Sequence, residues 1–335
     1  MHARDLVTDN VQLLSLPEVC LRIQQLAEDP HADMNEFGQL VIQDPALTTR
    51  LLKLVNSAYY GFPGRIDTVS RAVNLVGIAE LRNLTLAMAA MEVFGGLENE
   101  RFDMLGFWRH SVYCALVARF LARHARVLHA ERLFIAGLLH DVGRLLIFGL
   151  LPEPALRILQ RVADGEEPGV AERAELGFDH AAVGYELLSL WRLPDTLRSA
   201  VAEHHRPEAA ETARLEATLV HIADRIAHQV EAVALDRCSP RFDPFSGFTD
   251  PALLADIAER PWVDGIHASA WADTGLSAAI VDAAVAAAAA DFDEVLNREI
   301  VRPAVSPGAW SSISGLFDAI GYLDVKQQGI RVSRV

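Results

Sequence analysis

The sequence predicts an all-α fold, a multi-helix bundle followed by an additional helical region at the C-terminus. Apolar side chains recur at helical spacing along most of the chain, whereas the alternation that marks strands is scarce. Of the 335 residues 51% are apolar and 22% are charged, which is typical of globular proteins. This length suffices for two domains or one large domain with a sizeable core.

Residues 1–100 are expected to form a first helical unit. Asp44-Pro45 marks a helix start, with the aspartate as the cap and the proline in the first helical position. Gly61 and the Pro-Gly pair that follows it should end this helix. Ser70 should open a short helix, and Gly77 should separate it from a helix that runs to about residue 94.

Residues 101–237 are expected to form a second helical unit, and residues 238–335 a C-terminal helical extension. Glycine, proline and polar clusters predict breaks in the second unit near residues 127–130, 164–169, 193–194 and 207–211. In the extension, helices are expected at residues 252–259 and 275–299.

The charge and cysteine content exclude several classes of protein. The chain has 30 basic and 45 acidic residues, a net charge of −15, which argues against binding a nucleic-acid polymer. Its three cysteines, Cys20, Cys114 and Cys238, are far apart and support neither a thiolate zinc site nor a disulfide framework. Charged residues interrupt the apolar stretch at residues 133–151, and no signal peptide is recognisable. We therefore expect a cytoplasmic protein without a membrane span.

The second unit holds the residues that could carry chemistry. Five of its histidines and two of its aspartates are candidates, and most of them lie on apolar stripes of expected helices, where unpaired polar groups would be costly to bury. Asp141, for example, shares a stripe with Phe134, Leu138 and Leu145. The candidates are His110, His140, Asp141, His180, His204, His205 and Asp224.

Together these seven side chains predict a site for one or two divalent metal ions. Their nitrogen and carboxylate donors suit Fe, Mn, Zn, Co or Ni, and more than four ligands suggests two ions. A hydroxide between two such ions could attack phosphorus. Taken singly, each histidine could equally be a hydrogen-bonded core residue. The histidines His124, His129, His221, His228 and His267 are expected to be surface or packing residues.

These residues also resemble a known superfamily. His110-Ser111, His140-Asp141 and Asp224 are similar to the H…HD…D pattern of the HD metal-dependent phosphohydrolases. His180 and His204-His205 resemble the additional histidines of the HD-GYP branch, the cyclic-di-GMP phosphodiesterases. Arg206 replaces the glutamate that follows the histidine pair there, and the Gly-Tyr-Pro segment is missing. Cyclic-di-GMP hydrolysis is therefore not supported.

The first hundred residues resemble the HDOD domain, the HD-related output domain of bacterial signalling proteins. The resemblance covers about residues 10 to 235. It rests on Leu16-Pro17, VIQDPAL at 41–47, LVNSAYYG at 54–61 and AVNLVG at 72–77. It implies an all-α fold and a role in bacterial signal transduction.

The segment around Asn56, Ser57, Tyr60 and Gly61 is specific to this family. We interpret these residues as a helix stop rather than as a ligand contact.

Two functions remain open, with a weaker third. The first is a signalling output module that acts through protein partners or a bound ligand, with a structural, vestigial or regulatory metal site. The second is a metal-dependent phosphohydrolase acting on a nucleotide or phosphodiester. The third is a sensor that uses the metals to hold a nucleotide without cleaving it.

In the hydrolase hypothesis each candidate has a role. Asp141 would be catalytic and bridge two metals, and Arg144 would clamp phosphate, since a guanidinium binds phosphate but does not readily donate a proton. One metal would be completed by His110 and Asp224, with His140 as an anchor, and the other by His180, His204 and His205.

Overall fold

The fold is described from a computed structural model, which defines residues 1–28, 34–56, 65–95, 103–127, 130–237 and 268–294. Within those residues every regular element is helical, which confirms the all-α prediction. The helices are α1 (Ala3–Thr8), α2 (Val11–Leu14), α3 (Glu18–Glu28), α4 (Met34–Ile42), α5 (Pro45–Val55), α6 (Val69–Val76), α7 (Ile78–Phe94), α8 (Met104–His124), α9 (Glu131–Leu139), α10 (Val142–Leu150), α11 (Pro152–Ala163), α12 (Pro168–Leu176), α13 (His180–Leu190), α14 (Asp195–Ala202), the short 3-10 helix η2 (Pro207–Ala209), α15 (Arg214–Arg237), α17 (Ala268–Thr274) and α18 (Ala278–Glu294).

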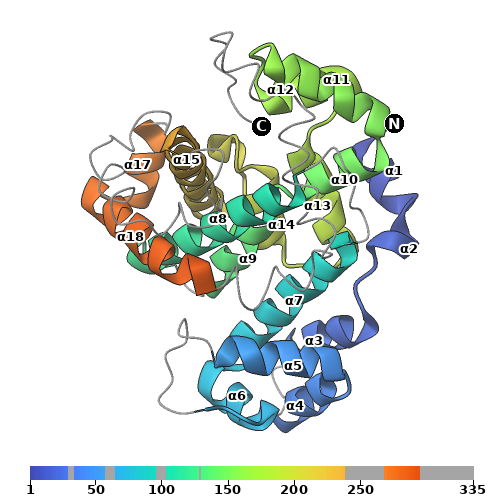
Figure 1. The fold of residues 1–335 in the computed structure, drawn as a ribbon, viewed down its shortest axis with the longest axis vertical. Coiled ribbons are helices and arrows are strands. Elements are labelled where there is room, and N and C mark those ends of the chain that lie inside the picture. Colours follow the sequence, from blue (N-terminus) through green and yellow to red (C-terminus); the bar gives the residue numbers. More distant parts are fainter. Residues whose placement is uncertain (29–33, 57–64, 96–102, 128–129, 238–267, 295–335) are drawn as a thin grey trace.

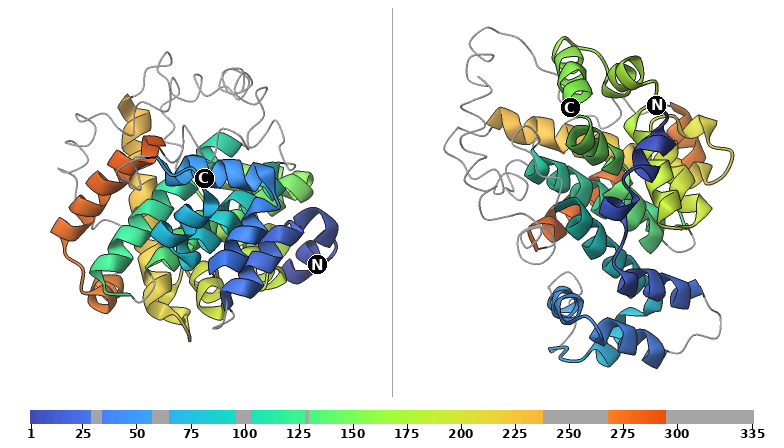
Figure 2. Two further views of the ribbon diagram at one scale, coloured as in Figure 1. Left: turned by 90° about the horizontal axis from the view of Figure 1, so that it is seen from below. Right: turned by 90° about the vertical axis from the view of Figure 1, so that its right-hand side faces the viewer.

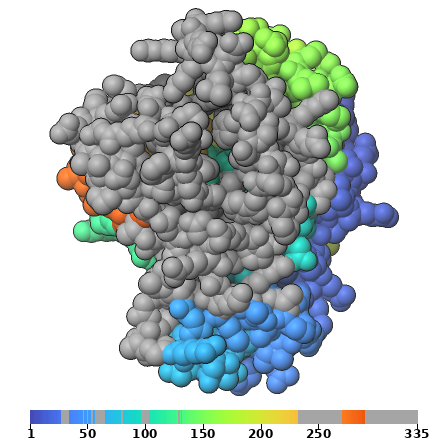
Figure 3. Space-filling view, viewed as in Figure 1, coloured from blue at the N-terminus to red at the C-terminus, as the bar shows by residue number. Residues whose placement is uncertain are grey.

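Helices α3 to α6 form a lobe at one end of the molecule, and α7 leads from it to the centre (Figure 1). In the space-filling view this lobe makes up the lower end of the surface (Figure 3). The segment Asn83–Met91 of α7 is buried on all sides, because α7 packs on α3 at one end and on α9 at the other. Helix α7 is thus the packed connection between the lobe and the central helices.

Most of the helix boundaries that the sequence predicts in this lobe agree with the structure. Asp44 caps α5 by accepting a hydrogen bond from the Leu47 backbone N–H at 3.0 Å. Helix α6 begins at Val69 rather than at Ser70, because the Thr68 hydroxyl accepts from the Arg71 N–H and is the cap.

Asn56 ends α5 and ties this helix to the following segment. Its side-chain amide donates to the Leu52 and Ile66 carbonyls, and its Oδ1 accepts from the Ile66 N–H, each at 2.6 Å. This supports the interpretation of Asn56 as a helix stop, while Ser57, Tyr60 and Gly61 lie outside the described residues.

The central helices surround one hydrophobic core. Helix α8 packs against α9, α15 and α18, and α10 packs against α13, which also contacts α14 (Figures 1 and 2). The first helix, α1, packs on α13, and the Trp191 indole N–H donates to the Leu14 carbonyl at 2.7 Å. The first 14 residues therefore belong spatially to the central helices, although they precede the lobe in sequence.

Two helices of the C-terminal region are described. Helix α18 lies on α8, where the Tyr113 hydroxyl donates to the Val285 carbonyl, and it matches the helix expected at 275–299. Helix α17, which was not expected, packs on α15 through the Arg214–Asp273 ion pair. The helix expected at 252–259 lies outside the described residues. The division into units at residues 100 and 237 stays a prediction.

One stretch of the described chain, Arg132–Leu150, is long and apolar enough to cross a membrane by length and composition alone. It comprises α9 and α10, and 89% of its most apolar part is buried inside the protein. Buried core helices commonly have this composition, so the stretch is weak evidence for a membrane span.

Candidate metal centre

A break between two helices places the central histidine and aspartate. We expected Asp141 on the apolar stripe of an uninterrupted helix, and this was wrong. Helix α9 ends at Leu139, and α10 begins anew at Val142, with Asp141 in the non-helical cap position. The break turns both His140 and Asp141 toward the same interior point, which a continuous helix would not do, because adjacent residues point about 100° apart.

Glycine permits the close packing of α10 on α13. A Cβ at Gly143 would lie 2.0 Å from the His180 carbonyl oxygen, so no larger residue fits there without displacing the backbone. The start of α13 is fixed further by its cap, Asp179, which accepts from the Ala182 N–H. These contacts hold His180 beside Asp141.

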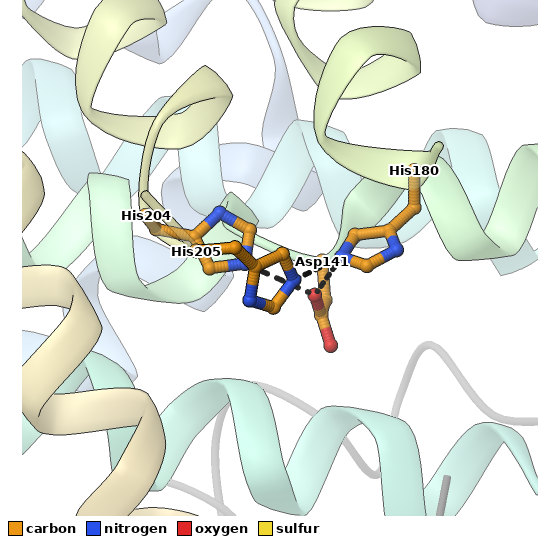
Figure 4. A group of neighbouring side chains, drawn as sticks. All are labelled: Asp141, His180, His204 and His205. Atoms are coloured by element: carbon orange, nitrogen blue, oxygen red, sulfur yellow. Dashed lines mark hydrogen bonds and ion pairs between the residues drawn. The ribbon is translucent and has the colours of Figure 1, made fainter. Parts of the chain in front are cut away.

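Four side chains, Asp141, His180, His204 and His205, form what we call the inner cluster (Figure 4). Each offers a donor atom, and these atoms all lie within 4.8 Å of one another. Asp141 Oδ1 lies 3.1 Å from His180 Nε2 and 3.6 Å from His204 Nε2. His205 Nε2 lies 2.8 Å from His180 Nε2.

A second group, the outer cluster, consists of His110, His140 and Asp224, with His228 and Glu231 beside them. His110 comes from α8 and the last three from α15. His110 Nε2 lies 3.1 Å from Asp224 Oδ1 and 3.2 Å from His140 Nε2. Asp141 Oδ2 lies 3.7 Å from His140 Nε2, so Asp141 stands between the two clusters.

The second ring nitrogen of three histidines is fixed by a hydrogen-bond acceptor outside the clusters. His140 and His204 donate through Nδ1 to the Gly137 and Val201 carbonyls, each at 2.7 Å. His180 Nδ1 lies 2.6 Å from Glu172 Oε2, which also accepts from the His180 backbone N–H. His110 Nδ1 lies at ion-pair distance, 3.3 Å, from Glu231 Oε1. These acceptors orient each Nε2 lone pair toward the clusters.

The result is that acceptor atoms face one another. His204 Nε2 and Asp141 Oδ1 are both buried, both have no hydrogen-bond partner, and lie 3.6 Å apart. In the outer cluster, His140 Nε2 lies 3.5 Å from Asp224 Oδ1, and His110 Nε2 is within hydrogen-bond distance of both atoms. Two lone pairs repel unless a cation lies between them. Imidazole and carboxylate donors fit a divalent transition metal ion, so the residues present fit such an ion.

The charge balance supports the same conclusion. Among the described residues, four carboxylates, those of Asp141, Asp224, Glu172 and Glu231, meet in and around the clusters, and the Arg144 guanidinium lies beside two of them. Asp141 and Asp224 are 2% exposed and Glu172 is 1% exposed. Buried excess negative charge is unfavourable unless cations balance it.

The pKa values of the histidines respond to this negative charge. Burial alone lowers the pKa of His180, yet Glu172 overcomes this and raises it to about 10. Burial also opposes protonation of His110, but Glu231 and then Asp224 raise its pKa to about 10. The carboxylates therefore favour a positive charge at His180 and His110, whereas burial lowers the pKa of His140 and of His205.

The aspartates remain ionised in spite of burial. Burial would raise the pKa of Asp141, but the adjacent Arg144 guanidinium and His140 hold it well below its usual range. His228 acts likewise on Asp224. Both carboxylates are thus available as anionic ligands.

Arg144 lies beside two of these carboxylates. It is 6% exposed, and its Nη1 lies 3.1 Å from Asp141 Oδ2. Its Nε lies 4.0 Å from Glu172 Oε1. In this place Arg144 neutralises the shared aspartate, and its role as a phosphate clamp stays a prediction.

The structure brings all seven expected metal ligands together and adds three residues that sequence reasoning missed. His228 was expected at the surface or in packing, yet its Nε2 lies 3.2 Å from Asp224 Oδ1. His228 and Glu231 follow Asp224 by four and seven residues, so helical spacing could have found them. Glu172, eight residues before His180, left no such signal. His221 does have a packing role, since its Nδ1 donates to the His204 carbonyl.

Comparison with known proteins identifies the family. Residues 13–207 match the HDOD domain model. An uncharacterized protein of Treponema pallidum (strain Nichols) is 32% identical over 200 residues, which cover 58% of this chain and 38% of that protein. The chain therefore spans less than half the length of this relative.

Solved structures agree with the helical fold. An HDOD domain protein of unknown function from Geobacter sulfurreducens has a TM-score of 0.61 at 24% identity, covering 86% of this chain and 99% of its own. A candidate phosphohydrolase from Shewanella amazonensis SB2B gives 0.64 at 24% identity, covering 87% and 97%. A candidate signal transduction protein from Marinobacter aquaeolei VT8 gives 0.63 at 19%, covering 93% and 61%. Because the HDOD model matches more than half of the chain, the protein belongs to the HDOD domain family.

Proposed function

We propose that this protein is a bacterial signalling output protein whose HDOD domain is built around a divalent metal centre and acts through protein partners. The observation that carries this is the pair of buried, unpartnered acceptor atoms in the inner cluster, His204 Nε2 and Asp141 Oδ1, which lie 3.6 Å apart. Such a centre would join α8, the α9–α10 break, α13, the segment after α14, and α15. A surface made by these helices would then depend on metal loading.

The residues divide between two ions. His110, His140 and Asp224 would hold one ion, and His180, His204 and His205 the other, with Asp141 shared between them. A bound divalent ion would supply the positive charge that these donors lack, and Lewis acidity toward any ligand that reached it. Iron, manganese, zinc, cobalt and nickel all suit this donor set.

Burial favours a regulatory role over turnover. His140, His180 and His204 are 0% exposed, and His110 is 6% exposed. Arg144 already pairs with Asp141 through Nη1. A nucleotide would have to displace these contacts to reach the ions.

The second candidate is a metal-dependent phosphohydrolase acting on a nucleotide or phosphodiester. Two observations favour it: the ligand set is complete, and His205, at the edge of the inner cluster, is only half-buried. In this reading a substrate would approach past His205, with Asp141 holding both ions.

Elemental analysis combined with a turnover screen tests both candidates. The full chain would be purified without tag or chelator, beside His140→Ala and the matched control His124→Ala, which changes an exposed histidine at the end of α8. We expect about two metal ions per chain in the wild type and the control and a loss in His140→Ala. Wild-type protein that stays metal-free after incubation with iron and manganese would contradict both candidates.

Turnover then separates the candidates. For a regulatory centre, we expect no hydrolysis of mononucleotides, cyclic dinucleotides or bis(p-nitrophenyl) phosphate by the metal-loaded protein. Robust hydrolysis that His140→Ala abolishes and His124→Ala retains would establish the hydrolase instead.

A further inference from the structure

A second polar site lies away from the metal centre, where the lobe of α3 to α6 meets the central helices. Arg132, near the start of α9, stands there between two cavities of about 60 and 20 Å³. Both cavities are lined by Arg132 and Leu197, so the two cavities flank the same side chains. None of the metal-cluster residues lines either of them.

The smaller cavity is lined by hydrogen-bond donors from three helices. Gln24 of α3 and Asn83 of α7 are 9% and 4% exposed. The side-chain nitrogens Gln24 Nε2, Asn83 Nδ2 and Arg132 Nε are all buried, and each is without a hydrogen-bond partner in the structure. Asn83 Oδ1 faces Arg82 Nη2 at 3.5 Å, which leaves its NH₂ group for the cavity. Buried donors of this kind require an acceptor.

The charge of the smaller cavity selects an anion. Arg82 and Arg132 both line it, and none of the described residues that line it is a carboxylate. The remaining lining is apolar: Leu86, Leu193, Pro194 and Leu197. Glu216 lies on the larger cavity instead, on the other side of Arg132. An acceptor that fills the smaller cavity is therefore favoured if it carries a negative charge.

The sizes of the cavities narrow the class of anion further. A volume of 20 Å³ holds about one or two water-sized groups, which matches the two oxygens of a carboxylate rather than a tetrahedral phosphate. The larger cavity is lined mostly by Val127, Leu133, Ala136, Leu197 and Ala200, so it suits a short aliphatic body.

We propose that this junction binds a short-chain organic carboxylate. The carboxylate accepts hydrogen bonds from Gln24, Asn83 and Arg132, and the aliphatic body lies beyond Arg132 in the larger cavity. Because Gln24 and Asn83 belong to α3 and α7, whereas Arg132 and Leu197 belong to α9 and α14, an occupied site links the lobe to the central helices. Such a ligand would be a direct input to the protein, independent of the metal centre.

Calorimetric titration of the full-length, metal-loaded protein tests this proposal. Sodium formate, acetate, propionate and butyrate would be compared at constant ionic strength, with chloride and inorganic phosphate alongside. We expect saturable binding that strengthens from formate toward the longer acids, and none for chloride. Arg132→Gln, which removes the charge, should weaken binding at least tenfold. The matched change Arg123→Gln, at an exposed arginine of α8, should leave it unaltered.

A second variant keeps the proposal testable if Arg132→Gln does not fold. Asn83→Asp conserves size but places a negative charge against the carboxylate, so it should also abolish binding. In both variants the metal content should stay at the wild-type value, which separates this site from the metal centre. Failure of every carboxylate to bind, tighter binding of phosphate, or unchanged binding in both variants would overturn the proposal.

Discussion

The inner and outer clusters are held in place by different means. In the inner cluster, Glu172 supports His180 from a separate helix, accepts two hydrogen bonds and has a side chain that is 1% exposed. In the outer cluster, Glu231 supports His110 from the same helix as Asp224, and its side chain is 22% exposed. Tertiary packing therefore fixes the inner cluster, whereas helical spacing arranges most of the outer one. We therefore expect a substitution of a supporting residue to reduce metal affinity less in the outer cluster than in the inner cluster.

Removing the shared ligand should have the largest effect. Asp141→Ala takes away the carboxylate that faces His180 and His204 through one oxygen and His140 through the other. It also leaves the buried Arg144 without its nearest partner. We expect both ions to be lost, as measured by elemental analysis.

The matched control for this change is Asp195→Ala, at an exposed aspartate at the start of α14. It should retain both ions. Retention of one ion by Asp141→Ala would show that the two clusters do not share this ligand.

Gly143→Ala should damage the inner cluster through packing. The new Cβ would lie 2.0 Å from the His180 carbonyl oxygen and 3.0 Å from the Gly184 nitrogen, so α10 and α13 must separate. We expect a loss of about 3 kcal/mol of unfolding free energy, the upper part of the usual range for overpacking. Urea unfolding of metal-free protein measures this.

Gly38→Ala provides the comparison for that measurement. Its Cβ would meet nothing closer than the Ser70 hydroxyl at 3.8 Å, and alanine favours the helix. This variant should be as stable as the wild type or more so. Equal stability of the two alanine variants would show that the contact of α10 with α13 is looser than described.

Glu172→Gln should weaken the inner ion specifically. The amide keeps the shape of the side chain but loses the charge that holds the His180 ring in place at 2.6 Å. Changes in such supporting residues reduce metal affinity by about 10- to 100-fold. A chelator competition should show one ion released earlier while the other is retained. Simultaneous release of both ions would mean that the clusters are not separable.

The same contrast between helical spacing and tertiary packing explains which features of the protein the sequence predicts. The helices of the lobe and α15 follow from local signals, such as the Asp44 cap and the regular spacing of apolar residues. The seven candidate ligands were found because histidines and aspartates stood on apolar stripes and matched a family pattern. The other features of the site depend on which helices lie side by side in space, and the local sequence does not encode that arrangement.

Two particular residues illustrate this limit. The break at Asp141 was missed because its residues are compatible with a continuous helix, and it forms where Gly143 meets the His180 backbone from another helix. Arg144 was expected to bind phosphate because an arginine beside metal ligands commonly does. Its actual partners, Asp141 and Glu172, became visible only when α12 was placed beside α10.

Glu231→Gln should have the smallest effect of these substitutions on metal binding. Glu231 supports His110 at 3.3 Å, but its side chain is 22% exposed, so water can replace part of what the carboxylate provides. His228 and Asp224 also remain beside His110. We expect the outer ion to bind less tightly by about tenfold or less, at the low end of the range for supporting residues.

The same chelator competition measures this, with Glu153→Gln, at an exposed glutamate of α11, as the control. If Glu231→Gln reduced metal affinity more than Glu172→Gln does, the outer cluster would be the more sensitive of the two. Charge near His110 would then matter more than burial near His180.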